Sequence, residues 1–331
     1  MNIGVIGAGS WGTTLANLLA GKGFTIALWA YEAELAGSMA VKKENHLYLP
    51  GIPLSENIIP TASLEEAAGG KDLLFIVTPS HVVRQTVQSL AAHLSAQTML
   101  VSASKGIENT TLLTMTAVIS DVLGLKDRQR LAVLSGPTFA LEVSKKIPSA
   151  VTLASENQPL AREIQQILST PFFRVYTNAD VAGVELGGAL KNVIAIAAGI
   201  SDGLSFGFNT RAALITRGLA EISRLALHMG ADRHTLSGLS GLGDLVLTCT
   251  GELSRNRTVG VRLGRGESLA EITRDMRTVA EGIRTAESAH DLSRRMGVAM
   301  PITEQVNSIL RGHKNPKEAV MELMTRDLKD E

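Results

Sequence analysis

Hydrophobic positions follow two different patterns along the chain. Up to about residue 178, short uninterrupted apolar runs alternate with longer segments in which apolar residues recur at helical spacing. Uninterrupted runs are typical of buried parallel strands, and amphipathic segments between them are typical of crossover helices. The pattern predicts a doubly wound, mostly parallel α/β sheet. We expect strands at residues 3–6, 25–29, 73–77, 99–102, 131–134, 150–154 and 173–176, and helices at residues 13–22, 80–94, 112–123 and 161–169.

The strand-like runs largely stop near residue 179. Helical patterns follow at residues 181–200, 210–229, 269–275, 285–296, 303–310 and 316–326. We therefore expect an α/β domain at residues 1–178 and an all-α C-terminal domain at residues 179–331.

Composition narrows the possible partners. The 331 residues are 45% hydrophobic and include 32 basic and 32 acidic side chains, a net charge of zero that argues against nucleic acid and anionic membranes as partners. Cys249 is the single cysteine, so no intramolecular disulfide can form, and seven scattered histidines do not suggest a zinc site. No secretion signal and no uncharged apolar stretch of about 18 residues is evident. We expect a soluble cytoplasmic protein without stable membrane insertion.

Three glycines lie between the first expected strand and the first expected helix. Residues 7–12 read Gly-Ala-Gly-Ser-Trp-Gly. In a Rossmann domain the first glycine permits a tight turn, the second lets the backbone approach a pyrophosphate, and the third lets the helix pack closely. Glycines in a loop can also mark an ordinary turn, but their position here favours a Rossmann domain. Gly7, Gly9 and Gly12 would then bind NAD or NADP at the helix N-terminus.

The end of the second expected strand should distinguish NAD from NADP. Residues 28–32 read Leu-Trp-Ala-Tyr-Glu. An acid at this place can bind the ribose 2′-hydroxyl of NAD, whereas an arginine would favour the 2′-phosphate of NADP. Glu32 lies near the expected position, but it could equally open the next helix. The sequence therefore leaves the cofactor preference open.

Two lysines have a functional interpretation beside a structural one. Lys191 and Glu185 are the only charged residues at positions 181–200, and no acid lies three or four residues from Lys191. Such a lysine either extends to solvent or is buried for chemistry, with a partner from elsewhere in the fold. Lys105 follows one expected strand, and Gly136 and Thr138 follow the next, at the carboxyl edge where open α/β sheets bind ligands. Each of these segments could also be an ordinary loop.

A glycine-rich segment at residues 237–243 leads to Asp244, and we expect a loop here that suits an anion. Arginine offers a planar pair of donors to a phosphate, and serine and asparagine add neutral donors. Ser254, Arg255 and Asn256 are therefore candidate phosphate ligands. Residues 255–284 contain seven arginines against four acids, and we expect most of these arginines on a solvated helical surface.

Seven motifs together resemble the bacterial type of NAD(P)-dependent glycerol-3-phosphate dehydrogenase. They are GAGSWG (7–12), SASKG (102–106), SGPTFA (135–140), ELGGALKNVIAIAAGISDG (185–203), GLGDLVLTCT (241–250), SRNR (254–257) and VAEG (279–282). They cover nearly the whole chain, and the later blocks are much more specific than the glycine turn. The resemblance implies reversible hydride transfer between NAD(P)H and dihydroxyacetone phosphate, giving sn-glycerol 3-phosphate for phospholipid synthesis. Independently of the resemblance, apolar helices in which glycines leave one face without side chains suggest a homodimer.

The resemblance also implies roles for individual residues. Lys191 matches the general acid/base, Asp244 a substrate-site acid and Thr248 a nearby hydroxyl, and Lys105 matches a residue close to both cofactor and substrate. The matches to substrate contacts are Gly136, Thr138, Ser254, Arg255 and Asn256, and the matches to cofactor contacts are Ser10, Trp11, Ala140, Arg255, Val279 and Glu281.

The implied chemistry predicts the surroundings of Lys191. As hydride reaches C2 of the ketone, an ammonium can stabilise the developing alkoxide and then donate its proton. This role needs a lysine pKa below the ordinary value of about 10.4, and both burial and a nearby Lys105 would lower the pKa. We hypothesise that Asp244 is the neighbour that holds the ammonium in place.

Tyr31 departs from the family pattern. Many bacterial relatives carry a histidine or arginine near this position, which can bind a 2′-phosphate, so Tyr31 argues against a strict NADP preference.

Two other classes of protein fit part of the sequence. A 3-hydroxyacid or ketopantoate-type dehydrogenase would need a basic residue for a carboxylate but no phosphate site. A non-enzymatic NAD(P)-sensing protein would need the glycine turn but neither Lys191 nor Asp244.

Overall fold

The computed structural model describes residues 1–126, 128–276 and 280–328. The chain divides into two compact units. The first, which we name the sheet unit, comprises Met1–Lys105 and Leu113–Glu185, and the second, the helical unit, comprises Gly106–Leu112 and Leu186–Glu331. The division falls near the start of α8 (Val181–Gly203), a few residues after the boundary expected from the sequence.

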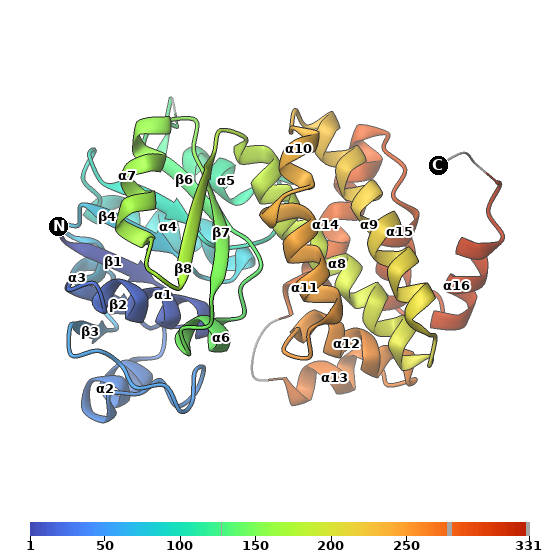
Figure 1. Ribbon diagram of the computed structural model, residues 1–331, viewed down its shortest axis with the longest axis horizontal. Helices are drawn as coiled ribbons and strands as arrows, with labels where there is room; N and C mark the ends of the chain where they lie inside the picture. The colour runs from blue at the N-terminus through green and yellow to red at the C-terminus, as the bar shows by residue number, and fades with distance from the viewer. Residues whose placement is uncertain (127, 277–279, 329–331) are drawn as a thin grey trace. The chain divides into compact units, whose positions relative to one another are not determined.

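The sheet unit is built on eight strands in the order β3-β2-β1-β4-β5-β6-β7-β8 (Figure 1). Neighbouring strands are parallel, except that β6 and β7 are antiparallel. The strand order reverses between β1 and β4, where ligands of open α/β sheets bind beyond the carboxyl ends. The strands are β1 (Ile3–Ile6), β2 (Ile26–Trp29), β3 (Ile58–Thr61), β4 (Leu73–Ile76), β5 (Met99–Ser102), β6 (Leu131–Ser135), β7 (Ser149–Ala154) and β8 (Phe173–Asn178).

Helices cover both faces of this sheet. One hydrophobic core joins Ile3 and Val5 of β1 to α1, α2 and α7, and a second joins Ile6 to α3, α4 and α5. Because successive side chains of a strand point to opposite faces, a strand covered on both faces is apolar throughout. The helices are α1 (Ser10–Ala20), α2 (Ala33–Lys42), α3 (Leu64–Ala68), α4 (Val83–Leu90), α5 (Met115–Leu123), α6 (Ala140–Ser144) and α7 (Gln158–Leu168), with short turns η1 (Ser80–Val82) and η2 (Ala91–His93) flanking α4.

The structure confirms the expected fold class, an α/β Rossmann arrangement followed by helices. Every strand expected from the sequence is present, but the pattern missed β3. This short strand contains Pro60 and exposes Ile59, so it lacks a continuous buried run. Proline is tolerated there because β3 lies at the edge of the sheet.

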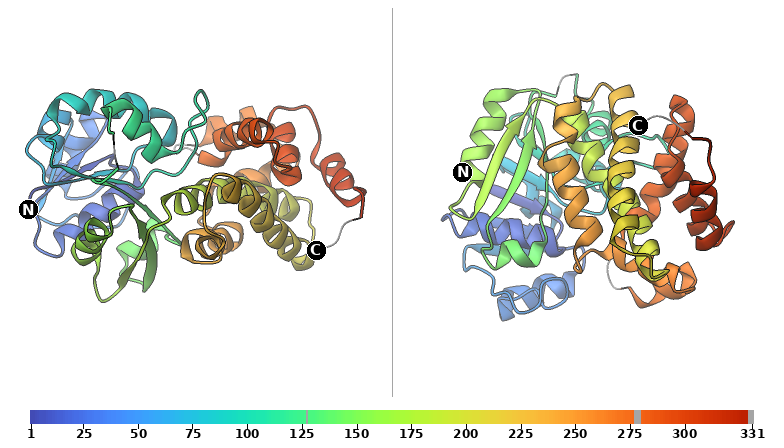
Figure 2. Two further views of the ribbon diagram at one scale, coloured as in Figure 1. Left: turned by 90° about the horizontal axis from the view of Figure 1, so that it is seen from above. Right: turned by 45° about the vertical axis from the view of Figure 1, so that its right-hand side comes forward.

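The helical unit is organised around α8, as Figures 1 and 2 show. This helix is long and apolar enough to span a membrane, with a mean hydropathy of 1.5, but 94% of its apolar window is buried inside the protein. It is therefore the core helix of the helical unit. The other elements are α9 (Phe208–His228), α10 (Arg233–Leu236), η3 (Leu239–Gly243), α11 (Asp244–Thr250), α12 (Arg255–Gly264), α13 (Leu269–Asp275), α14 (Glu281–Met296), α15 (Pro301–Leu310) and α16 (Pro316–Met324).

The glycine-bare face of α8 is covered by backbone of the same chain. A Cβ atom on Gly187 would lie 2.6 Å from the carbonyl oxygen of Ser240 in η3, and Cβ atoms on Gly199 and Gly203 would collide with the backbone of α12. Helices can cross this closely only where no side chain intervenes. The bare face therefore packs the helical unit internally and gives no support to the expected homodimer.

Candidate active site

The glycine turn has the geometry that its sequence predicts. Gly7 has a φ of +120°, and a Cβ atom there would lie 2.8 Å from the carbonyl oxygen of Val77. A Cβ atom on Gly12 would collide with the Gly7 carbonyl, so α1 packs directly on the turn. At Gly9, in contrast, a Cβ atom would meet nothing within 4 Å. The turn thus exposes backbone beside the N-terminus of α1, where unpaired N–H groups attract anions.

Buried hydroxyls surround the carboxyl ends of the neighbouring strands. Thr78 follows β4, and Ser102 and Ser135 close β5 and β6. The side-chain oxygens of these three residues are buried and have no hydrogen-bond partner among the described residues. Buried polar groups are nearly always paired in native proteins, so orphans of this kind commonly meet water or a ligand. Together with the open backbone at Gly9, they fit a polar ligand such as a dinucleotide.

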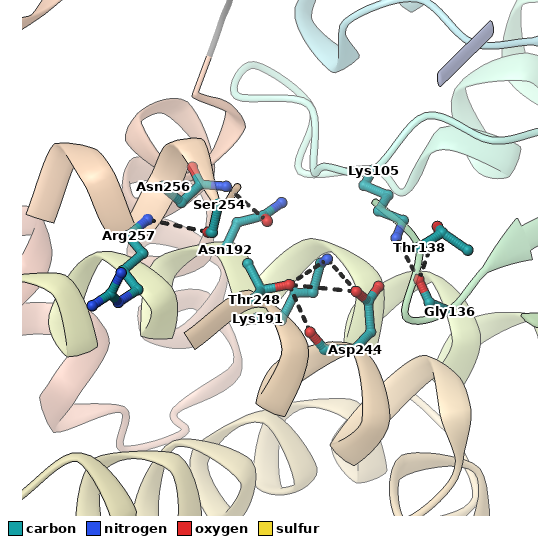
Figure 3. Close-up of polar contacts among 10 residues, drawn as sticks. All are labelled: Lys105, Gly136, Thr138, Lys191, Asn192, Asp244, Thr248, Ser254, Asn256 and Arg257. Atoms are coloured by element: carbon teal, nitrogen blue, oxygen red, sulfur yellow. Dashed lines mark hydrogen bonds and ion pairs between the residues drawn. The ribbon is translucent and has the colours of Figure 1, made fainter. Parts of the chain in front are cut away.

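Three predicted site residues of the sheet unit meet at the same edge (Figure 3). The Nζ of Lys105 and the hydroxyl of Thr138 both donate to the carbonyl oxygen of Gly136, each over 3.3 Å. Gly136 has a φ of +152°, and a Cβ atom there would lie 2.9 Å from the Cα of Val151, so only glycine fits. The segments at 102–106 and 135–140 are therefore tied to each other rather than being separate loops.

The predicted cofactor residues Ser10 and Ala140 also lie together. The hydroxyl of Thr14 is 2.8 Å from the carbonyl oxygen of Ser10 and 3.2 Å from that of Ala140, which links α1 to α6. Trp11 packs its ring against Phe173, with centroids 6.3 Å apart. The Trp11 side chain therefore serves packing, and its backbone N–H in the first turn of α1 is what it offers to a phosphate.

Lys191 and Asp244 meet because α8 and the η3–α11 segment pack in register. Gly187 lies against Ser240, and four residues further along each segment the Lys191 Nζ forms an ion pair with Asp244 Oδ1 (Figure 3). One turn later, Thr248 accepts a hydrogen bond from the same Nζ at 2.8 Å. The structure confirms the hypothesis that Lys191 and Asp244 are neighbours.

This cluster is buried in the helical unit. Lys191 is 6% exposed and Asp244 1% exposed. The Thr248 hydroxyl donates to the carbonyl oxygen of Asp244 at 2.6 Å, which leaves its oxygen to accept from Lys191. Taking both charges out of water costs several kcal/mol per ion, so such a pair is weak evidence for a stabilising role. Its geometry fixes one nitrogen that can hold, donate or accept a proton.

The first turn of α12 carries the predicted phosphate ligands. Ser254 caps this helix, because its side-chain oxygen accepts a hydrogen bond from the Arg257 N–H at 3.2 Å. Arg255 begins the helix, and its side chain reaches the surface. Desolvation by nearby atoms lowers the pKa of Arg255, and the carboxylate of Glu281 opposes this shift. Since arginine stays protonated at neutral pH, the guanidinium and the helix N-terminus offer positive charge to one anion.

Asn256 is buried and links three helices. Its Nδ2 donates to Asn192 Oδ1 at 2.9 Å (Figure 3). Its Oδ1 accepts from the Gly282 N–H, also at 2.9 Å. Asn192 is the neighbour of Lys191 on α8, so the link ties the first turns of α12 and α14 to the lysine cluster. Asn192 was not among the predicted site residues, and its signal in the sequence is its place beside Lys191 in the motif at 185–203.

One expectation was wrong and another falls outside the described residues. The glycine-rich segment before Asp244 is not a loop, because Leu239–Gly243 forms a π-helical turn that leads straight into α11. Its glycines serve close packing: a Cβ atom on Gly241 would collide with the backbone of Leu236. π-Helical turns often occur at functional sites. Val279 lies outside the described residues.

An open hollow of about 390 Å³ along α14 and α15 contains none of the predicted site residues. It is lined by His290, Asp291, Arg294, Glu304, Asn307, Ser308, Arg311 and His313. In the described ranges, no group of three or more His, Cys, Asp or Glu residues could hold a metal ion.

A doubly wound sheet with an open glycine turn, followed by helices that bury a lysine–carboxylate pair, defines an NAD(P)-dependent dehydrogenase. The family model for the NAD-dependent glycerol-3-phosphate dehydrogenase N-terminus matches residues 2–161, and that for the C-terminus of the same family matches residues 180–321. The chain belongs to the NAD-dependent glycerol-3-phosphate dehydrogenase family.

Individual relatives agree with this assignment. The glycerol-3-phosphate dehydrogenase, NAD(P)+, of Geobacter sulfurreducens is 60% identical over 329 residues, covering 99% of this chain and 98% of that protein. The same enzyme of Syntrophotalea carbinolica is 56% identical over 331 residues, covering 100% of this chain and 99% of that protein. The crystal structure of glycerol-3-phosphate dehydrogenase from Coxiella burnetii is 40% identical, with a TM-score of 0.94 over 98% of this chain and 99% of that one.

The alternative ketopantoate-type enzymes share only the fold. The ketopantoate reductase of Ralstonia eutropha is 15% identical, with a TM-score of 0.58 over 97% of this chain and 100% of that one. Similarity at this level shows a common architecture and carries no information about the substrate.

Proposed function

We propose that this chain catalyses the reversible reduction of dihydroxyacetone phosphate to sn-glycerol 3-phosphate, with NADH or NADPH as the hydride donor. Family membership supports the reaction. The single observation that carries the assignment is the buried cluster of Lys191, Asp244 and Thr248, because ketone reduction needs a positioned proton donor and this cluster fixes one. A sensing protein would have no use for such a buried ionic pair.

The sheet unit is proposed to hold the cofactor. The backbone N–H groups at Gly9, Ser10 and Trp11 bind the pyrophosphate, and Gly7 and Gly12 shape the turn. The bound nicotinamide supplies the hydride in reduction and accepts it in oxidation. Ala140, Val279, Arg255 and Glu281 are further proposed cofactor contacts, given by the family resemblance.

Lys191 is proposed as the general acid/base. Its ammonium stabilises negative charge on the C2 oxygen of the substrate and then transfers a proton to that oxygen, and neutral Lys191 takes the proton back in the reverse direction. Asp244 holds the ammonium in position through the ion pair, and Thr248 fixes the direction of a second Nζ hydrogen bond. Both partners are buried, so their electrostatic effect on Nζ is weakly screened.

The phosphate group of the substrate is proposed to bind at the start of α12. Arg255 supplies charge, and Ser254 and Asn256 belong to the same turn. Because the phosphate is close to the reacting carbon, anchoring it limits the orientations in which the ketone can be presented. Lys105, Gly136 and Thr138 are proposed substrate contacts from the sheet unit, with Lys105 also contacting the cofactor.

The product is proposed to supply the glycerol backbone of phospholipids in the cytoplasm. Rescue of a bacterial glycerol 3-phosphate auxotroph by this chain tests that role. A homodimer is proposed from the apolar character of the helices in the helical unit, and light scattering tests it by a mass of twice the 35.1 kDa chain.

The reaction is tested by following NADH and NADPH absorbance with three substrates in parallel: dihydroxyacetone phosphate, dihydroxyacetone and ketopantoate. We expect efficient turnover only of the phosphorylated ketone. With NADH saturating, so that the proposed cofactor contact of Arg255 does not limit the rate, Arg255→Ala should lower kcat/KM for dihydroxyacetone phosphate by about 10- to 150-fold, as expected for the loss of a charged hydrogen bond of about 1.5–3 kcal/mol. The residual rate with dihydroxyacetone should change little. Preferred turnover of ketopantoate would overturn the proposed reaction, and equal losses on both ketones would remove Arg255 from phosphate binding.

A further inference from the structure

Glu32 lies beside the glycine turn, immediately before α2. The Gly7 N–H donates to the carbonyl oxygen of Trp29, the last residue of β2, at 3.1 Å, and Glu32 follows three residues later. Glu32 occupies the N-cap position of α2, but its side chain makes no capping hydrogen bond. An acid selected to open a helix normally accepts from N–H groups of the first turn. The helix-opening interpretation therefore does not explain this carboxylate.

A chain of hydrogen bonds ties Glu32 to the glycine turn. The hydroxyl of Tyr48 donates to Glu32 Oε1 at 2.8 Å, and the Tyr48 N–H donates to Asn45 Oδ1 at 3.0 Å. Asn45 is fully buried, and its Nδ2 donates to the carbonyl oxygen of Ala8 and to the hydroxyl of Thr13, both at 2.8 Å. The carboxylate is thus held relative to the backbone that is proposed to bind the pyrophosphate.

The hydrogen bond leaves half of the carboxylate available. Desolvation raises the pKa of Tyr48, and its hydrogen bond and Coulomb interaction with Glu32 raise it further, so the hydroxyl remains a donor at neutral pH. No hydrogen bond or ion pair engages Oε2 of Glu32 within the described part of the chain. One oxygen is therefore fixed by Tyr48, and the other can accept a hydrogen bond from a ligand hydroxyl.

The surrounding charge is negative. Residues 30–41 and 62–70, which follow β2 and β3, contain no lysine, arginine or histidine, and their acids are Glu32, Glu34, Glu65 and Glu66. Of the basic residues that come next, Lys42 lies in the last turn of α2, Lys43 is paired with Glu56 at 3.0 Å, and His46 contacts a serine. A phosphate dianion requires cationic donors, so this edge of the sheet opposes one.

We infer that Glu32 selects NAD over NADP: its carboxylate accepts a hydrogen bond from the 2′-hydroxyl of the adenine-side ribose and repels a 2′-phosphate. Tyr48 is a positioning residue that holds this carboxylate. The inference deepens the proposed function and rests on it only in requiring that the dinucleotide binds at the glycine turn.

The test measures the dissociation constants of NADH and NADPH by nicotinamide fluorescence, with the full chain and without substrate. We expect wild type to bind NADH at least about tenfold more tightly than NADPH, because juxtaposed like charges cost several kcal/mol. Glu32→Gln should bring the two affinities to within about threefold of each other, because the repulsion is removed. Glu34→Gln is the matched control, since it removes the same charge two residues away and should leave the ratio within about twofold of wild type.

Two further variants test the parts of the inference separately. Tyr48→Phe should lower the NADH preference while the chain stays folded by circular dichroism, whereas an unchanged ratio would remove Tyr48 as a positioning residue. Glu32→Ser combined with Tyr31→Arg should reverse the preference toward NADPH. Equal affinities in wild type, or equal shifts in Glu32→Gln and Glu34→Gln, would overturn the role of Glu32. Selective NADH binding without reduction of dihydroxyacetone phosphate would refute only the proposed reaction.

Discussion

Asp202 joins the core helix to two of its neighbours, and its removal should weaken both junctions. It lies in the last turn of α8. Its Oδ1 accepts from Arg211 of α9, with Nε at 3.0 Å and Nη2 at 2.5 Å, and its Oδ2 accepts from Arg257 of α12, with Nε at 2.8 Å and Nη2 at 2.7 Å. The carboxylate side chain is only 9% exposed. Asp202→Asn removes the charge and one of the two acceptor oxygens.

The magnitude follows from the partners and their exposure. An asparagine keeps one acceptor oxygen but turns an NH2 group toward the second guanidinium, so one arginine loses its hydrogen bonds. Neither guanidinium charge is then balanced by a carboxylate. Removing one partner of a fully buried pair costs about 3–5 kcal/mol. Because the arginine side chains are 20% and 21% exposed, water compensates in part, and we expect a loss of about 2 kcal/mol in the free energy of unfolding. Arg257 lies two residues after Arg255, so the KM for dihydroxyacetone phosphate should also rise.

Urea unfolding measures the first effect and steady-state kinetics the second. The matched control is Asp275→Asn, since Asp275 also accepts from an arginine of α12, Arg262 at 2.7 Å, but is 62% exposed. Exposed pairs are worth about 0–1 kcal/mol, so the control should cost no more than about 0.5 kcal/mol and leave KM unchanged. Equal losses in the two variants, or an unchanged stability of Asp202→Asn, would refute this reasoning.

Two further predictions concern stability. Lys22 donates to three carbonyl oxygens at the C-terminal end of α7, at 2.6–2.8 Å. Because this lysine is largely exposed, Lys22→Met should lower the free energy of unfolding in urea by only about 1 kcal/mol. A loss near zero would contradict a role of Lys22 in capping α7. Glu221 is buried against the N-terminus of α15, and desolvation raises its pKa from 4.5 to about 7, against opposing hydrogen bonds from Ile302 and Thr303. The folded state therefore binds the proton more tightly than the unfolded state, so the stabilisation is complete below pH 4.5 and is lost as the pH rises through about 7. The wild-type minus Glu221→Gln difference in unfolding free energy should fall by up to about 3 kcal/mol over this range, and a flat difference would contradict the shift.

The fold could be predicted where burial on two faces leaves a clear mark in the sequence. Strand β1 is apolar at every position because both faces are covered, and its neighbours follow the same rule. Strand β3 was not predicted because it is the edge strand of the sheet and therefore tolerates Pro60, which interrupts the apolar run. Helix α11 was not predicted because the glycines before Asp244 suggest a loop. In the structure these glycines allow close packing against α8 and α10, which depends on tertiary contacts.

The site could be predicted in part for similar reasons. Lys191 lacks any acid within a helical turn, which correctly implied a distant partner, and the family motif pointed to Asp244. The role of Asn192 could not be read from its neighbours, because its partner Asn256 lies 64 residues away. Glu32 stayed ambiguous because Tyr48, which holds its side chain, approaches only once the segment after α2 has folded back toward the glycine turn.

Lys191 is proposed to move the proton in ketone reduction, and Lys191→Met removes the amine that would do so. The measurement is kcat for reduction of dihydroxyacetone phosphate, made on a variant that still binds NADH with wild-type affinity. General acid catalysis contributes about 10²–10⁴ in rate, so kcat should fall by at least 100-fold. A kcat within a few-fold of wild type would contradict the account.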